Sequence, residues 1–238
     1  MIDLTLYRID AVLFTLLFGF LLGVSIYGFW YGLHRSGREE DERRMRITRF
    51  VGILLVWVVL TGVLAYTGFF RDFDAVPPRF PMLVLPPFIL VIWLSFSRYF
   101  APVLKALPLF WLTLIQGFRI VVEIILWLGA EGGFVPPQMT FEGLNFDILS
   151  GILAIPVAFL VFKRRVLPTW VGLVYHLIGL ALLPTIITVA ILSLPVFGVF
   201  TPPNLFVSEL PFVWLPAFVV PFALALHLFA LRKLLKGT

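Results

Sequence analysis

Two ionisable residues, Arg119 and Glu123, lie four positions apart inside an otherwise apolar run, LPLFWLTLIQGFRIVVEIILWLG, that covers Leu107–Gly129. Such a run predicts a membrane-spanning helix, because about 20 residues cross the hydrocarbon core of a bilayer. A charged side chain at the centre of that helix costs at least ~2.5–3.5 kcal/mol unless it faces protein or water. Because positions four apart share a helical face, we expect Arg119 and Glu123 to pair with each other.

Thr113 and Gln116 precede this pair at helical spacing, so the four side chains form one polar stripe that must face the interior of a bundle. Two interpretations stay open. The stripe is either a clamp between helices or a binding site, in which Arg119 holds an anionic group of a substrate or Glu123 binds a proton or cation. Buried charge in a membrane helix favours function by default.

The segment after this helix, AEGGFVPPQMTFEGLNFDILSG, contains acidic and amide side chains and no basic residue. We expect Asp147 to cap the next helix, where a carboxylate meets the positive end of the helix dipole. Apolar residues interleave with the polar ones, so the loop Gly132–Asp147 is predicted to fold back over the bundle as a lid above Glu123; a merely packed loop explains the same residues. For an enzyme acting on a lipid-linked substrate, Glu142 and Asp147 would be the catalytic carboxylates and Asn145 a hydrogen-bond donor.

His176 and His227 lie at similar depths near the ends of two later apolar runs. Two facing histidines could ligate the iron of haem b, but two unrelated interfacial histidines are the favoured interpretation. The chain has no cysteine, no HExxH, no Walker loop and no GxSxG motif. We therefore expect no metal and no cofactor, with haem b as the lesser alternative, and a role other than catalysis is favoured.

Composition places these residues in a membrane protein. Hydrophobic residues make up 61% of the chain and charged residues 13%, whereas soluble domains are about 25% charged. The net charge of +5 does not indicate nucleic-acid binding, because the charges lie in short loops between apolar runs. The first run is too long for a cleavable signal peptide and is expected to remain as an anchor.

The apolar runs predict an all-α fold, a bundle of seven transmembrane helices in a single domain over residues 1–238. The predicted spans are Ala11–Leu33, Phe50–Phe70, Met82–Leu104, Leu107–Gly129, Ile148–Phe162, Trp170–Leu194 and Phe212–Leu231.

Basic residues set the predicted orientation. Fourteen of the eighteen lysines and arginines lie in loops that this topology places on one side. The positive-inside rule then puts the N-terminus outside and the C-terminus in the cytoplasm.

The segment from Gln116 to Arg119 with Glu123, the stretch MTFEGLNFDIL and the stretch FVWLPAFVVPFALALHLFALRKL together resemble uncharacterised bacterial polytopic inner-membrane proteins. The resemblance covers roughly the second half of the chain. It implies an integral protein of the bacterial inner membrane, carries no activity or cofactor, and draws attention to Arg119, Glu123, Glu142, Asn145 and Asp147.

The sequence thus favours a protein that binds or transports a small molecule, proton or ion at a site formed by Gln116, Arg119, Glu123, Glu142, Asn145 and Asp147. The alternatives are a non-catalytic scaffold within a membrane complex and the lipid-directed enzyme. The expected partners are the lipid bilayer and a small ligand or ion, with a homo-oligomer or a larger complex left open.

Overall fold

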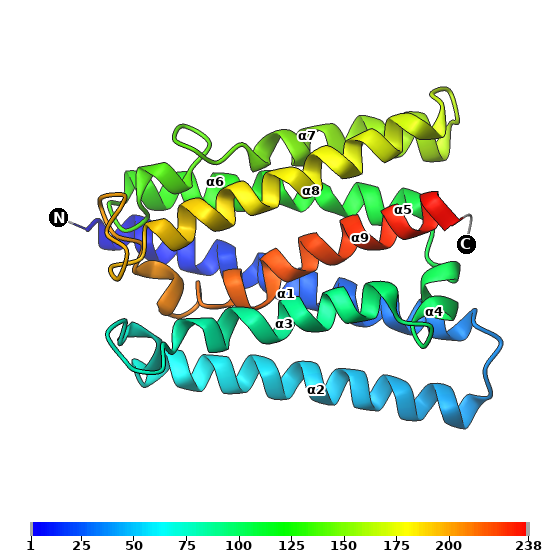
Figure 1. Cartoon of the computed structure of the whole chain (residues 1–238), viewed down its shortest axis with the longest axis horizontal. Helices are drawn as coiled ribbons and strands as arrows, with labels where there is room; N and C mark the ends of the chain where they lie inside the picture. The colour runs from blue at the N-terminus through cyan, green and yellow to red at the C-terminus, as the bar shows by residue number, and fades with distance from the viewer. Residues whose placement is uncertain (1, 237–238) are drawn as a thin grey trace.

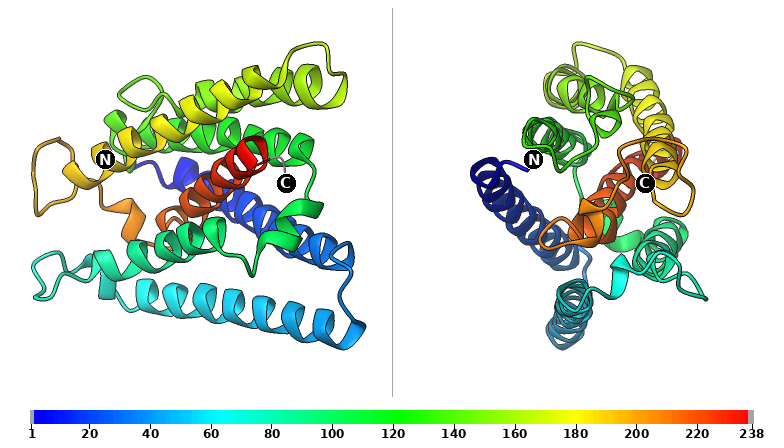
Figure 2. Two further views of the ribbon diagram at one scale, coloured as in Figure 1. Left: turned by 45° about the vertical axis from the view of Figure 1, so that its right-hand side comes forward. Right: turned by 90° about the vertical axis from the view of Figure 1, so that its left-hand side faces the viewer.

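Long runs of leucine, valine, isoleucine and phenylalanine fold into helices that lie side by side in a bundle (Figures 1 and 2). The structure is a computed structural model, and it describes residues 2–236. The α-helices are α1 (Leu4–His34), α2 (Glu40–Tyr66), α3 (Phe80–Phe96), α4 (Ala101–Ala106), α5 (Leu109–Leu114), α6 (Phe118–Glu131), α7 (Asp147–Val157), α8 (Thr169–Leu192) and α9 (Val220–Lys236). The all-α class predicted from the sequence is confirmed.

Within residues 2–236, five helical segments are long and apolar enough to cross a membrane. Two are α1 and α2. The third, Leu109–Glu131, joins α5 to α6 through a 3₁₀ turn at Ile115–Gly117. The fourth is α8, and the fifth, Leu215–Lys236, begins with a π-helical turn at Leu215–Val219 and continues as α9. These segments make the chain a polytopic integral membrane protein.

The expected third span, Met82–Leu104, is a shorter helix in the structure, whereas the expected fifth span, Ile148–Phe162, is slightly longer. The third ends at Phe96 rather than Leu104, because Ser97 adopts an extended conformation and α4 is a separate helix. Pro86 and Pro87 lie inside α3, which continues past both of them. The fifth runs through the 11 residues of α7 and 6 further residues of π-helix, Ala158–Lys163, that follow Pro156.

Helix α9 lies in the interior of the bundle and packs against α8, α3 and α5, whereas α2 lies along the outside (Figures 1 and 2). Pro221 has no N–H with which to bond the carbonyl one turn back, that of Ala217. The indole N–H of Trp57 on α2 donates to this carbonyl at 3.1 Å. A side chain from a neighbouring helix thus satisfies a backbone group that the proline leaves free.

The two ends of the bundle differ in charge. Figure 1 places the start of α1 at one end, and the C-terminal end of α9 at the other. The α1–α2 turn, α4 and the α7–α8 turn lie at the same end as the C-terminal end of α9. The basic clusters Arg35–Arg49, Lys163–Arg165 and Arg232–Lys236 therefore gather at one end of the bundle.

Candidate functional site

The polar stripe on α5 and α6 faces the interior of the bundle, as its spacing predicts. Thr113, Gln116, Arg119 and Glu123 are all buried, with at most 2% of any one residue exposed. Gln116 donates from Nε2 to the carbonyl of Ala223 on α9 at 3.1 Å. The stripe thus connects α5 and α6 to the helix at the centre of the bundle.

Arg119 forms an ion pair with Asp147 rather than with Glu123, so the pairing expected from the sequence is wrong. Its Nε–H donates to Asp147 Oδ2 at 2.9 Å, and its Nη2 reaches the second carboxylate oxygen. Its Nη1 donates to Ser150 Oγ at 2.9 Å and lies 2.9 Å from His227 Nε2. One guanidinium group therefore joins α6 to α7 and α9.

The start of α7 explains why Asp147 is free to bind Arg119. The expectation that Asp147 caps this helix is wrong, because Asp147 is its first residue and Phe146 occupies the cap position without a side-chain bond. Asn145, one residue before the cap position, satisfies the first backbone N–H of the helix, since its Oδ1 accepts from the N–H of Asp147 at 3.1 Å. The Asp147 carboxylate can then turn toward Arg119.

Glu123 takes its only hydrogen bond in the described chain from the loop. Asn145 donates from Nδ2 to Glu123 Oε1 and also to the carbonyl of Met139, the latter at 3.0 Å. The other carboxylate oxygen, Oε2, is buried without a hydrogen-bond partner among residues 2–236. Glu123 thus lies in the protein interior, and no basic side chain of the described residues forms an ion pair with it.

The loop Gly132–Asp147 packs into the bundle, and Val135, Met139, Thr140 and Asn145 are buried. Figure 1 shows this segment connecting α6 to α7 near the end of the bundle at which α1 begins. Glu142 is exposed, so the loop brings Asn145 and Asp147 to the stripe but leaves Glu142 outside. The two carboxylates considered for a lipid-directed enzyme are therefore not placed together: Glu142 is at the surface and Asp147 is paired with Arg119.

His176 on α8 and His227 on α9 face each other with their Nδ1 atoms 3.0 Å apart. His227 Nε2 accepts from Arg119, so the proton of this neutral ring is on Nδ1 and is donated to His176. His176 then carries its proton on Nε2, which lies 3.0 Å from Thr113 Oγ1, and Thr113 donates to the carbonyl of Leu109 at 2.9 Å. These contacts form one directed chain of hydrogen bonds from Arg119 toward the start of α5.

The distance of 3.0 Å between the Nδ1 atoms of His176 and His227 also bears on metal binding. Imidazole nitrogens that share a metal each lie about 2.0–2.1 Å from it, as they do on zinc. Nitrogens on opposite sides of one ion are thus farther apart than the 3.0 Å between the two Nδ1 atoms. The described residues contain no group of three or more His, Cys, Asp or Glu side chains that could hold a metal.

Two glycines make the close approach of these helices possible. A Cβ at Gly179 on α8 would lie 2.8 Å from Ser150 Oγ and would overlap the His227 ring. A Cβ at Gly151 on α7 would lie 2.9 Å from the backbone nitrogen of Ile120. We call the side chains gathered here the polar network; its members are Thr113, Gln116, Arg119, Glu123, Asn145, Asp147, Ser150, His176 and His227.

Sequence reasoning missed Asp10, Ser150 and the contact of His227 with Arg119. Asp10 is fully buried, but the first span was predicted to begin at Ala11, which left it in the flanking segment. Helix α1 in fact begins at Leu4. The buried carboxylate could have been found by extending the helix back to Asp3, whose side chain accepts from the N–H groups of Thr5 and Leu6.

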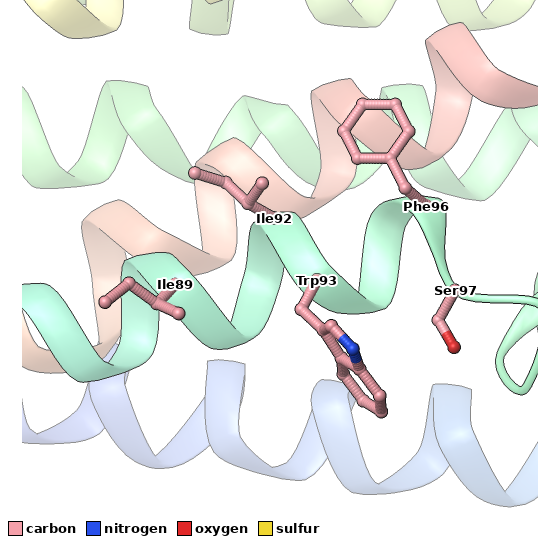
Figure 3. Close-up of a pocket in the computed structure, with 5 residues that line it drawn as sticks. All are labelled: Ile89, Ile92, Trp93, Phe96 and Ser97. Carbon is pink, nitrogen blue, oxygen red and sulfur yellow. The ribbon is translucent and has the colours of Figure 1, made fainter.

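Two apolar hollows lie on the surface of the protein, away from the polar network. One is lined by Ile89, Ile92, Trp93 and Phe96 on α3 and by Ser97, which follows it (Figure 3). The other lies between α1 and the segment before α9 and includes Leu16, Leu210 and Trp214. Their exposed apolar side chains suit contact with lipid tails.

No protein-family model, curated protein or solved structure matches this chain. The functional argument therefore depends on the polar network itself.

Proposed function

We propose that this protein binds a proton or a small cation at Glu123 and moves it across the membrane, with the loop Gly132–Asp147 controlling access. Glu123 carries the proposal: it is 1% exposed, Asn145 is its hydrogen-bond partner, and its Oε2 has no partner among the described residues. An isolated buried carboxylate is costly, so it takes up a proton or pairs with a cation.

The distribution of charge supports this assignment. Arg119 is the only basic side chain of the stripe, and Asp147 forms its ion pair. Glu123 is then left as a second carboxylate without a basic partner in the polar network. A site with one guanidinium and two carboxylates suits a positive ligand better than an anionic substrate held by Arg119.

The loop supports a gating role because one short segment holds the two buried charges of α6. Asn145 binds Glu123, while Asp147 and Ser150 bind Arg119. A displacement of this segment would release both contacts together and open a route to Glu123. The residues that this segment supplies therefore support gating by the loop.

We further propose the seven-span topology in the bacterial inner membrane, with the N-terminus outside. The gathering of basic segments at one end of the bundle supports this orientation. Helix α3 and the π-extended α7 would then span as shorter helices inside the bundle.

Ion flux tests the function. The purified protein is reconstituted into lipid vesicles that hold a pH-sensitive dye, and a proton or sodium gradient is imposed. Wild-type vesicles should dissipate the proton gradient, or couple it to sodium, faster than empty vesicles. Glu123→Gln should reduce the rate to that of empty vesicles, because an amide keeps the bond to Asn145 but cannot exchange a proton.

Glu142→Gln is the matched control, since it removes an exposed carboxylate from the same loop. It should keep the wild-type rate. Folded Glu123→Gln protein with wild-type flux would overturn the proposal, as would wild-type vesicles that behave like empty ones.

A scaffold within a membrane complex is the second candidate, and the contacts of Arg119 favour it. This side chain bonds Asp147 and Ser150 on α7 and His227 on α9, which is what a clamp between helices requires. A scaffold would retain its fold and its partners after Glu123→Gln and would show no flux.

A further inference from the structure

A second carboxylate, Asp10, is buried at the interface between α1 and α6. It lies in the second turn of α1 and is 0% exposed. Neither of its carboxylate oxygens has a hydrogen-bond partner among the described residues. Buried polar groups nearly always have a hydrogen-bond partner in proteins. The residues around Asp10 must therefore show how the charge of its carboxylate is accommodated.

Asp10 lies beside apolar side chains that pack on Gly129 of α6. Its Oδ2 lies 3.0 Å from the point that a Cβ at Gly129 would occupy, and side chains of Phe134 and Val135 reach the same point. The turn that carries them is attached to α1, because the backbone N–H of Asp3 donates to the carbonyl of Gly132 at 3.0 Å. Tyr7 packs edge-on against Phe134, with 5.0 Å between ring centroids. The start of the loop thus closes over the carboxylate.

Oxygen ligands for a metal ion are scarce at this point. Calcium and magnesium take about six or more oxygen ligands. The nearby carbonyl of Gly129 already accepts from the N–H groups of Phe134 and Val135, each at 3.1 Å. A proton needs no further ligand and removes the charge outright.

Charged groups on the elements packed against Asp10 do not pair with it. Arg119 and Glu123 on α6 are bound to Asp147 and Asn145. The remaining ones are exposed at the surface: Asp3 just before α1, Arg8 on α1, Glu131 on α6 and Glu142 on the loop. His34 lies at the opposite end of α1.

We propose that Asp10 is a proton-binding site, a carboxyl group held in its neutral acid form between α1 and α6 and exchanged when the turn Gly132–Val135 moves. The carboxylate gains one proton from water and loses it again, and no other bond changes. The site is separate from Glu123 and stands on its own contacts. The loop Gly132–Asp147 covers both carboxyl groups, Asp10 at its start and Glu123 through Asn145 near its end.

Infrared spectroscopy of the full-length protein in lipid vesicles tests this. Protein is prepared with aspartate that carries heavy carbon at the side-chain carboxyl. At neutral pH the carbonyl band of a protonated carboxylic acid should be present in the wild type and should shift with the aspartate label. Glutamate is unlabelled, so this band is distinct from any band of Glu123. The test is also independent of the flux measurement, because a protein that moves no ions should still show the Asp10 band.

Variants assign the band. Asp10→Asn should remove it, whereas Asp72→Asn, at an exposed aspartate paired with Arg79, should retain it. The labelled wild-type protein tests for a protonated aspartate without any substitution. The proposal therefore remains testable even if Asp10→Asn fails to fold. The absence of a label-sensitive band in the wild type would overturn the proposal, as would its persistence in folded Asp10→Asn protein.

Exchange is measured by transfer into heavy water. The band should move to lower frequency as deuterium replaces the proton. A band that keeps its position after prolonged exposure would overturn the exchange that we propose.

Discussion

Arg119 on α6 and Asp147, the first residue of α7, form a buried ion pair across 28 positions of the sequence. The neighbouring Glu123 is bound instead by Asn145, two residues before Asp147. The two opposite charges of one helical turn therefore have separate partners, and both partners come from the same short segment. This arrangement leaves Glu123 as the carboxylate without a basic partner.

Removing one member of the Arg119–Asp147 pair should destabilise the protein more than removing both. Arg119→Leu leaves Asp147 buried and uncompensated, which costs about 3–5 kcal/mol in soluble proteins. Arg119→Leu combined with Asp147→Leu should recover most of this free energy of unfolding, because a buried pair is often replaceable by apolar residues. Unfolding of the purified protein in mixed micelles, followed by circular dichroism, measures the difference.

Arg119→Leu combined with Glu123→Leu is the control for this pairing. Glu123→Leu removes a buried carboxylate that has no basic partner, so it should change the free energy of unfolding by nearly the same amount whether Arg119 is present or replaced. A coupling between Arg119 and Glu123 as large as that between Arg119 and Asp147 would contradict the pairing seen in the structure.

The histidine pair should carry two different tautomers. The directed hydrogen bonds place the proton of His227 on Nδ1 and that of His176 on Nε2. Nitrogen NMR of isotope-labelled histidine distinguishes the two forms, and the chain has only three histidines to assign. His34→Gln should leave both buried signals in place.

Arg119→Leu should alter the signal of His227 first, because this substitution removes the donor to Nε2. Identical tautomers in the two buried rings would contradict the direction of the hydrogen-bond chain.

The local sequence pattern predicted that the chain is helical and that the stripe is buried. It did not predict which side chains bind Arg119 and Glu123. The spacing of Thr113, Gln116, Arg119 and Glu123 determines that they share a face, and apolar flanks determine that this face is buried. The choice of Asp147 over Glu123 depends on how the loop returns into the bundle, which no local spacing encodes. Asp10 was missed for a related reason, since only the contact of α1 with α6 and the loop shows that it is enclosed.

Cysteine labelling checks the proposed orientation, and the chain offers a clean background because it contains no cysteine. Glu39→Cys lies beside the start of α2 at the basic end, and Asp74→Cys lies between α2 and α3 at the other end; both positions are exposed. A membrane-impermeant maleimide should label Asp74→Cys in intact cells and Glu39→Cys only after permeabilisation. The reverse pattern would place the N-terminus inside.

Gly179 on α8 should be intolerant of any side chain, because the helices of the polar network meet there. A Cβ at this position would lie 2.8 Å from Ser150 Oγ and would overlap the His227 ring. Gly179→Ala should therefore lower the free energy of unfolding by about 1–3 kcal/mol, the usual cost of overpacking. Because His227 must move away, its nitrogen NMR signal should change as well.

Gly19 on α1 provides the matched control, since a Cβ there has no neighbour within 4 Å. Gly19→Ala should leave stability unchanged or raise it slightly, because alanine is the better helix former by about 1 kcal/mol. If the two alanine variants were equally stable and His227 kept its signal in Gly179→Ala, α8 would not approach Ser150 and His227 as closely as the structure requires. The contacts of Arg119 with Ser150 and His227 would then need to be revised, since both depend on that approach.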